Sequence, residues 1–228
     1  MDIDKRKELI SYLREFATES RWEKIVSTAQ QRTRHLTVIV EDIYQPHNAS
    51  AVLRSCDGFG IQDVHIIENQ NKFEASNQVT IGADQWLTIH RYNKPGTDNT
   101  ERCFSRLKEN GYRIIATTPH KDDTNLNELD ITKKTALVFG SEIDGISEKA
   151  VELADGFMKI PMYGFSESFN ISVSAAVCLY NLTRRLRAAD IPWKLSKNEI
   201  EELTLEWLRQ SIRAGEKLEK AFLKGEGS

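Results

Sequence analysis

The sequence predicts an α/β protein in which helices cover a largely parallel β-sheet. Short apolar runs rich in Val and Ile recur from residue 36 onward, and segments with helical periodicity separate them. Strands that alternate with helices are typical of a parallel sheet with both faces buried. Of the 228 residues, 39% are hydrophobic and 29% are charged, so the chain has enough apolar mass for one domain-sized core.

The first 35 residues predict a short helical extension ahead of the sheet. Leu9, Leu13 and Ile25 belong to a set of apolar residues that recurs at helical intervals over residues 3–32, among many basic and acidic side chains. Two interpretations of the basic residues stay open at this stage. They form either a solvated amphipathic face or an arm that contacts phosphates.

Several short segments between residues 36 and 161 have the composition of buried strands. They are apolar and, for the most part, rich in β-branched residues, which suit the interior of a sheet. They are residues 36–41, 64–68, 86–90, 113–118, 135–140 and 157–161.

Helices are predicted in the intervals between these strands. The first covers residues 48–57 and has Gly58 as a candidate left-handed cap. A second covers residues 100–110 and ends at Gly111, and a short third covers residues 147–153. These helices supply the two covering layers that a parallel sheet needs.

The last part of the chain is predicted to be mostly helical. A helix rich in small residues starts near Asn170 and ends in a group of arginines, namely Arg184, Arg185 and Arg187. A second helical pattern begins after Pro192, where Ser196 followed by Glu199 matches a capping box. We therefore divide the chain into an N-terminal helical extension, a sheet domain and a C-terminal helical extension, at residues 1–35, 36–187 and 188–228.

Composition and motif searches disfavour several classes of protein. The formal net charge is -3, so any nucleic-acid interface must come from local basic patches. The three cysteines are widely spaced, which fits reduced thiols in the cytoplasm, and no metal-ligand spacing is present. Dinucleotide, P-loop and nucleophile-elbow motifs are also missing. No secretory signal or membrane-spanning run is visible, so we expect no membrane partner.

A first polar cluster, His47, Asn48 and Arg54, lies at the start of the helix over 48–57. Asn48 is well placed to cap this helix, and a cap-only role is one interpretation. Arg54 lies about 9 Å further along the axis at the rise of an α-helix, but long helical side chains lean back toward the N-terminus. Arg54 is thus expected either to serve the same site or to form a surface salt bridge.

Two more polar clusters follow later strands. In the first of them, Gly140 and Gly145 allow backbone amides to approach a ligand, and Glu142 accepts hydrogen bonds or supports the start of a helix. In the second, Ser168 and Asn170 lie within the polar turn of the segment 160–177. One cap needs a single hydroxyl or amide, whereas this turn supplies several. Polar groups gathered at strand ends predict a ligand site.

Together, the three clusters resemble the motifs of the SpoU/TrmH family, RNA 2′-O-ribose methyltransferases of the SPOUT class. The matching segments are residues 48–60, 137–147 and 160–173, and the resemblance spans about residues 36–187. Two departures are mild: Ile143 and Asp144 stand where many relatives have Gly after the Glu, and Phe169 stands where Leu is usual. Neither departure removes a polar group.

The resemblance implies a fold and a cofactor that periodicity cannot predict. The C-terminal segment of the sheet would thread a loop in a deep trefoil knot, a topology that is nearly absent elsewhere. S-adenosylmethionine would bind in the knot, without a metal, through backbone groups around Thr117, Gly140, Ile160 and Phe169. A homodimer with its active site at the subunit interface is implied as well.

The resemblance also implies roles for the polar residues. The family assigns activation of the ribose 2′-hydroxyl to the arginine that matches Arg54. A guanidinium stays protonated in proteins and makes a poor base, so we expect Arg54 to hold the neighbouring phosphate and the developing alkoxide. Asn48, Glu142, Ser168 and Asn170 would shape the pocket and orient Arg54.

The helical extensions at the two ends of the sequence indicate which type of RNA is the substrate. Short helical extensions at both ends resemble the branch of the family that methylates guanosine 18 in the D-loop of tRNA. The implied RNA contacts are the basic N-terminal helix together with His47, Arg184, Arg185 and Arg187. A ribosomal-RNA methyltransferase of the same family stays open as an alternative. A non-catalytic RNA-binding protein that kept the fold also stays open, although neither a missing arginine nor a broken third motif is seen.

Overall fold

The computed structural model describes residues 1–74, 80, 82–118 and 124–225. The chain divides into two compact units. One consists of Thr33–Trp193, and the other consists of Met1–Arg32 together with Lys194–Ser228.

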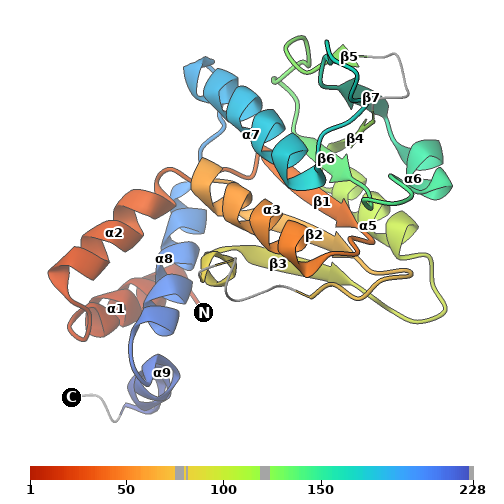
Figure 1. Cartoon of the computed structure of the whole chain (residues 1–228). Helices are drawn as coiled ribbons and strands as arrows, with labels where there is room; N and C mark the ends of the chain where they lie inside the picture. The colour runs from red at the N-terminus through yellow and green to blue at the C-terminus, as the bar shows by residue number, and fades with distance from the viewer. Residues whose placement is uncertain (75–79, 81, 119–123, 226–228) are drawn as a thin grey trace. The chain divides into compact units, whose positions relative to one another are not determined.

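The larger unit is built on a sheet that is parallel throughout its described strands (Figure 1). The strand order is β3-β2-β1-β6-β4-β7-β5. The bounds are β1 Leu36–Glu41, β2 Asp63–Ile67, β3 Thr88–Tyr92, β4 Arg113–Thr117, β5 Thr124–Asn125, β6 Thr135–Phe139 and β7 Gly156–Lys159. Strands β1, β2 and β6 are buried along their whole length, as expected for a sheet covered on both faces.

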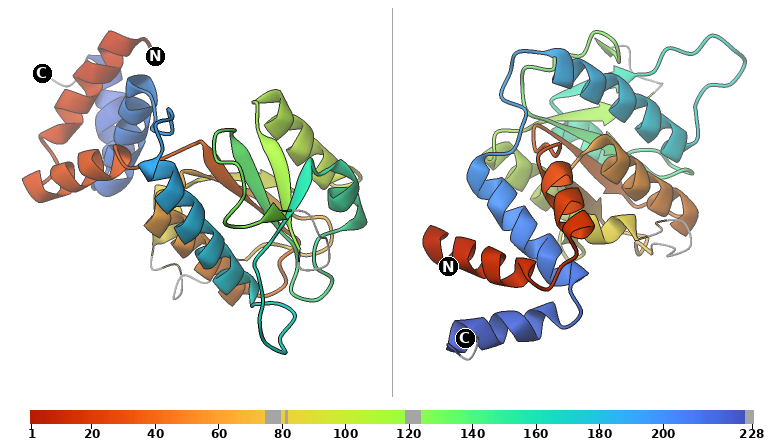
Figure 2. Two further views of the ribbon diagram at one scale, coloured as in Figure 1. Left: turned by 90° about the horizontal axis from the view of Figure 1, so that it is seen from above. Right: turned by 90° about the vertical axis from the view of Figure 1, so that its left-hand side faces the viewer.

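Two helical layers enclose this sheet (Figure 2). On one face lie α3 (Pro46–Phe59) and α7 (Ile171–Ala188), which pack against each other and share a core with Val38 and Val40 of β1. On the other face lie α5 (Asn99–Glu109) and α6 (Glu148–Leu153), which share a second core with Ile39. The alternation along β1 reflects the two-residue period of a strand.

The predicted α/β class with a parallel, helix-covered sheet is confirmed. The first helix, however, begins at Pro46, because a proline is pre-set for the first helical position and needs no donor there. Its left-handed cap is Gly60 (φ 81°), so the choice of Gly58 was wrong. Strand β3 starts two residues later than predicted because Ala83–Trp86 forms a short 3-10 helix, η1.

The smaller unit contains α1 (Ile3–Arg14), α2 (Glu19–Ala29), α8 (Lys197–Ser211) and α9 (Gly215–Lys224). The capping box of Ser196 and Glu199 is present with both of its hydrogen bonds. Two arginines of the N-terminal segment make contacts within this unit. Arg6 binds the side chain of Asn198 at 2.7 Å, and Arg32 lies 5.2 Å from the ring centre of Trp207. No described helix has the length and apolarity that crossing a membrane requires.

Candidate functional site

The site is assembled from the three polar clusters at the carboxyl edge of the sheet. Asn48 Nδ2 donates to Glu142 Oε1 at 2.6 Å, and Asn48 Oδ1 accepts from Asn170 Nδ2 at 3.1 Å. These two bonds join residues that are 94 and 122 positions apart in the sequence. The predicted convergence of the clusters is therefore seen as one chain of side chains, Glu142–Asn48–Asn170.

Glu142 supports the beginning of α3. Its carboxylate accepts from the backbone amides of Tyr44 at 3.1 Å and Gln45 at 3.4 Å, directly before the helix. Gln45 is the N-cap residue and provides no side-chain cap of its own. A carboxylate at the amino end of a helix interacts favourably with the helix dipole. Glu142 thus caps a helix that is distant in the sequence.

Asn48 has a different local role from the predicted one. It lies inside α3, so it is not the N-cap residue, and its side chain is buried. Asn170 does cap a helix, since its Oδ1 accepts from the backbone amide of Ser172 at 2.8 Å at the start of α7. Its amide nitrogen remains available for Asn48, so capping and bridging are combined in one side chain.

The loop after β6 has a tight backbone. The amides of Ser141 and Gly145 bond to each other's carbonyl oxygens at 2.8 and 3.1 Å, and Gly145 has a φ of 71°. A β-carbon on Gly140 would lie 2.1 Å from the carbonyl carbon of Gly145. Only glycine permits this close approach, which keeps the loop compact beside the cavity.

A cavity of about 670 Å³ opens among these elements, a size typical of small-molecule sites. Predicted site residues line it, namely Thr117, Gly140, Glu142, Ser168, Phe169 and Asn170. A smaller hollow beside it, of about 70 Å³, is lined by Thr117, Ile160, Ser168 and Phe169. All four residues expected around the cofactor therefore face one hollow or both.

Sequence reasoning missed other members of the lining. Met162, Thr118 and Ser174 also face these hollows. Ser174 lies one helical turn after Asn170, and its backbone amide donates to the Asn170 carbonyl oxygen at 2.9 Å. The helical period of residues 171–188 was the available signal for Ser174.

Arg54 does not line the cavity. It is exposed on α3, and the described part of the chain offers no ion-pair partner for it, which leaves the salt-bridge interpretation without support. His47 is exposed at the start of the same helix. The structure thus separates Arg54 and His47 from Asn48, although all three belong to one sequence cluster.

The arginines at the end of α7 differ in their surroundings. Arg184 is exposed, whereas Arg187 donates to the Phe59 carbonyl oxygen at 3.3 Å and lies over the Trp193 ring. Partial burial lowers the pKa of the Arg187 guanidinium. Arg185 donates to the carbonyl oxygens of the loop that follows β5. Arg184 and Arg187 are both exposed, so both are accessible to a polyanion, whereas Arg185 is partly buried.

The same helix carries an apolar stripe that faces solvent. Val173, Val177 and Tyr180 follow one another at helical spacing and are 43%, 37% and 58% exposed. Tyr180 also lies 6.3 Å, centre to centre, from the ring of Phe59 on α3. These three exposed apolar side chains therefore share one side of α7.

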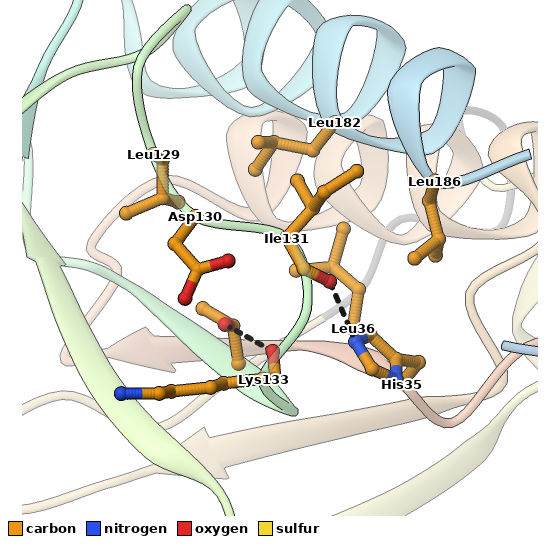
Figure 3. Close-up of a pocket in the computed structure, with 9 residues that line it drawn as sticks. His35, Leu36, Leu129, Asp130, Ile131, Lys133, Leu182 and Leu186 are labelled. Atoms are coloured by element: carbon orange, nitrogen blue, oxygen red, sulfur yellow. Dashed lines mark hydrogen bonds between the residues drawn. The ribbon is translucent and has the colours of Figure 1, made fainter. Parts of the chain in front are cut away.

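Another pocket lies at the amino ends of β1 and β6, away from the three clusters (Figure 3). It is mostly apolar, and its volume of about 10 Å³ is close to that of one water-sized probe. His35 Nε2 is already bonded to the Ile131 carbonyl oxygen at 2.8 Å. The pocket is a small packing gap and is too small for a ligand. Among the residues that the structure describes, no group of His, Cys, Asp or Glu side chains could hold a metal ion.

Comparison with known proteins agrees with this geometry. The model of the SpoU rRNA Methylase family matches residues 35–180. The tRNA (guanosine(18)-2'-O)-methyltransferase of Borreliella burgdorferi is 39% identical over 93% of this chain and 95% of its own length. The enzyme of the same name from Thermus thermophilus is 36% identical over 85% and 98%.

Solved structures show the same fold. The A. aeolicus TrmH/SpoU tRNA modifying enzyme superposes with a TM-score of 0.75 at 30% identity, over 86% of this chain and 98% of its own. The SpoU methyltransferase AviRb of Streptomyces viridochromogenes, solved with AdoMet, has a TM-score of 0.59 at 23% identity over 72% and 62%. The family match covers most of the sheet unit and all three polar clusters. This chain therefore belongs to the SpoU rRNA methylase family.

Proposed function

We propose that this protein transfers a methyl group from S-adenosylmethionine to the 2′-hydroxyl of guanosine 18 in the D-loop of tRNA. The observation that carries the proposal is the Glu142–Asn48–Asn170 chain, which joins the three motif regions beside a ligand-sized cavity. Relatives with this activity in their names align with this chain over 95% and 98% of their own lengths.

The residues present fit S-adenosylmethionine. Ile160 and Phe169 offer apolar surface for an adenine, and the Gly140 backbone is unobstructed by a side chain. The Thr117 hydroxyl already donates to the Val138 carbonyl oxygen at 2.8 Å, so Thr117 contributes its backbone and its oxygen lone pair. When bound, the cofactor supplies the electrophilic methyl group.

Catalysis then depends on positioning and on charge. The 2′-oxygen must approach the methyl group in line, the new O–C bond would replace the sulfonium S–C bond, and the hydroxyl proton would pass to water. Ser168 and Asn170 lie on the cavity wall, where they can orient the ribose. Arg54 stabilises the neighbouring phosphate and the developing alkoxide as a fixed cation. We expect Arg54→Lys to lower turnover at least about tenfold without changing cofactor affinity; unchanged turnover in a folded variant would exclude a specific guanidinium role.

The position of Arg54 supports the proposal of a homodimer. Arg54 lies outside the cavity of its own chain, on the helix that packs beside α7 and its stripe of Val173, Val177 and Tyr180. A second copy that covers this stripe would meet Arg54 as well. The active site would then be completed at the subunit interface, and the buried stripe would stabilise the pair.

The remaining parts of the proposal concern topology, RNA and cell compartment. The trefoil knot that the family resemblance implies is expected in the C-terminal segment of the sheet. We assign RNA contacts to His47, Arg184 and Arg187, and to the helical extensions at residues 1–35 and 188–228. Arg6 and Arg32 are engaged within the smaller unit, so other basic residues of α1 and α2 would contact the phosphates. The free buried cysteines are compatible with the cytoplasm.

The test is a methylation assay on tRNA transcripts that differ only at guanosine 18. Methyl incorporation should require this guanosine, and mapping of bulk tRNA should find the modification at that nucleotide. Incorporation that survives its replacement would exclude the position, and methylation of ribosomal RNA alone would favour the ribosomal alternative. If saturating S-adenosylmethionine fails to raise the melting temperature, a non-catalytic RNA-binding role is favoured.

A further inference from the structure

Glu41 is a buried carboxylate at the carboxyl end of the central strand β1. It is 1% exposed and does not line the cavity. Alternation along β1 places it on the side of Ile39, toward α5 and α6. A buried charge is costly unless hydrogen-bond donors surround it, so its partners show what it holds.

The partners of Glu41 come from two other segments. Oε1 accepts from the Thr100 hydroxyl at 2.6 Å and from the Ser147 hydroxyl at 2.8 Å. Oε2 accepts from the backbone amide of Ser147 at 2.9 Å. Bonds to an ionised acceptor are stronger than neutral ones, so Glu41 firmly ties Ser147 to the central strand.

Ser147 is the far end of the loop that carries Glu142. This loop leaves β6 at Gly140 and ends at Ser147, whose hydroxyl also accepts from the Ala150 amide at 3.0 Å as the N-cap of α6. One end of the loop is thus fixed by the sheet and the other by Glu41. Between them, the backbone pair of Ser141 and Gly145 keeps the loop closed.

We propose that Glu41 is a positioning residue that holds the 140–147 loop in the shape that binds the cofactor. Without it, Ser147 would keep its cap on α6 but lose its attachment to β1. Gly140 and Glu142 would then no longer be held at a fixed place beside the cavity. The identity of the ligand rests on the proposed function, whereas the hold on the loop rests on the geometry alone.

The chain provides an internal control, because one carboxylate serves two separate segments. Thr100→Val removes the bond to α5, together with the bond of 2.9 Å that Asn69 Nδ2 donates to the Thr100 hydroxyl, and leaves both bonds to Ser147. Glu41→Gln replaces one acceptor oxygen with a donor group and so weakens the attachment of the loop. A residue that acts only through overall stability would show the same effect on ligand affinity in both variants.

The experiment compares the full-length wild type with Glu41→Gln and Thr100→Val. Calorimetric titration with S-adenosylmethionine should give a Kd about tenfold higher for Glu41→Gln, and a Kd within about twofold of wild type for Thr100→Val. Hydrogen exchange of the amides in residues 140–147 should accelerate in Glu41→Gln only.

A second pair of variants covers the case in which Glu41→Gln does not fold. Ser147→Asp keeps an oxygen that can cap α6 but places a carboxylate against Glu41. Ser147→Thr keeps the cap and the bond to Glu41. We expect weaker cofactor binding and faster loop exchange for Ser147→Asp, and wild-type behaviour for Ser147→Thr.

Three results would count against these ideas in different ways. Wild-type affinity and loop exchange in both Glu41→Gln and Ser147→Asp would overturn the positioning role. Equal losses of affinity in Glu41→Gln and Thr100→Val would overturn it as well, because they would indicate a general effect on stability. A wild-type protein that does not bind S-adenosylmethionine would refute the proposed function. Amide hydrogen exchange in residues 140–147 would still test whether Glu41 holds the loop in place.

Discussion

Replacing Asn48 by Ala should destabilise the sheet unit and disconnect the candidate site. The Asn48 residue is only 7% exposed, and its side chain links Glu142 at 2.6 Å to Asn170 at 3.1 Å. The substitution removes both bonds, together with a long bond of 3.5 Å to Gln45 Oε1, and leaves helix propensity no worse, because alanine is the best helix former. The effect therefore reports the lost contacts of the Asn48 side chain.

The size of the loss follows from the surroundings of the two partners. A hydrogen bond to a charged group contributes about 1.5–3 kcal/mol, and a neutral one contributes about 0.5–1.5 kcal/mol. The low end of each range applies, because Glu142 keeps two backbone donors and Asn170 is exposed to water. We expect a loss of about 2 kcal/mol in the free energy of unfolding, or about 4–8 °C in Tm.

Urea and thermal unfolding of the purified protein measure this loss. The matched control is Asn127→Ala, which removes an exposed bond between Asn127 and Asn181 of 2.7 Å and should change stability by less than about 0.5 kcal/mol. Methyl transfer should fall in the Asn48 variant and persist in the control. A loss below about 0.5 kcal/mol with unchanged methyl transfer would refute the structural role of the Glu142–Asn48–Asn170 chain.

The remaining predictions concern the loop, acid stability and the apolar stripe. Gly140→Ala should abolish measurable cofactor binding by calorimetry, because its β-carbon would lie 2.1 Å from backbone, whereas Gly164→Ala, with open space around its β-carbon, should bind normally. Burial, and then the charge of a neighbouring imidazole, lowers the pKa of His65 from 6.5 to about 3. The folded state therefore binds fewer protons than the unfolded state, so the His65 contribution to stability is complete above pH 6.5 and is lost as the pH falls toward about 3. Urea unfolding between these limits should show a shallower pH dependence for His65→Phe than for wild type, and equal slopes would contradict the assignment. Val177→Glu should yield monomers in light scattering and inactive protein, whereas Thr132→Glu, at another exposed position, should do neither; a dimeric Val177 variant would argue against the stripe as the interface.

The local elements of the fold were predictable because their signals are local. The strand over residues 36–41 has the predicted bounds, and the capping box of Ser196 and Glu199 forms as expected. Strand β5 escaped prediction because two residues carry no periodicity. Only the structure shows the order of the strands in the sheet, which is β3-β2-β1-β6-β4-β7-β5.

The residues of the candidate site were easier to predict from the sequence than the contacts between them. Sequence reasoning grouped Asn48 with Arg54, but six residues turn a helix through about 600°, so the two side chains point about 120° apart. One therefore faces the interior and the other faces solvent. The sequence left a helix-start role open for Glu142 but did not indicate α3, because a carboxylate can cap a helix from a distant loop without leaving a local pattern.

By itself, the sequence determined the parallel α/β class, the three polar clusters and their resemblance to a methyltransferase family. These follow from hydrophobic period, turn residues and motif spacing, all of which act over a few residues. Only the tertiary structure decided that Asn48 bridges Glu142 and Asn170, that Arg54 lies outside the cavity of its own chain, and that Glu41 holds the loop end at Ser147. The physical reason is that these contacts join segments far apart in the chain, whose meeting is set by strand order and helix packing.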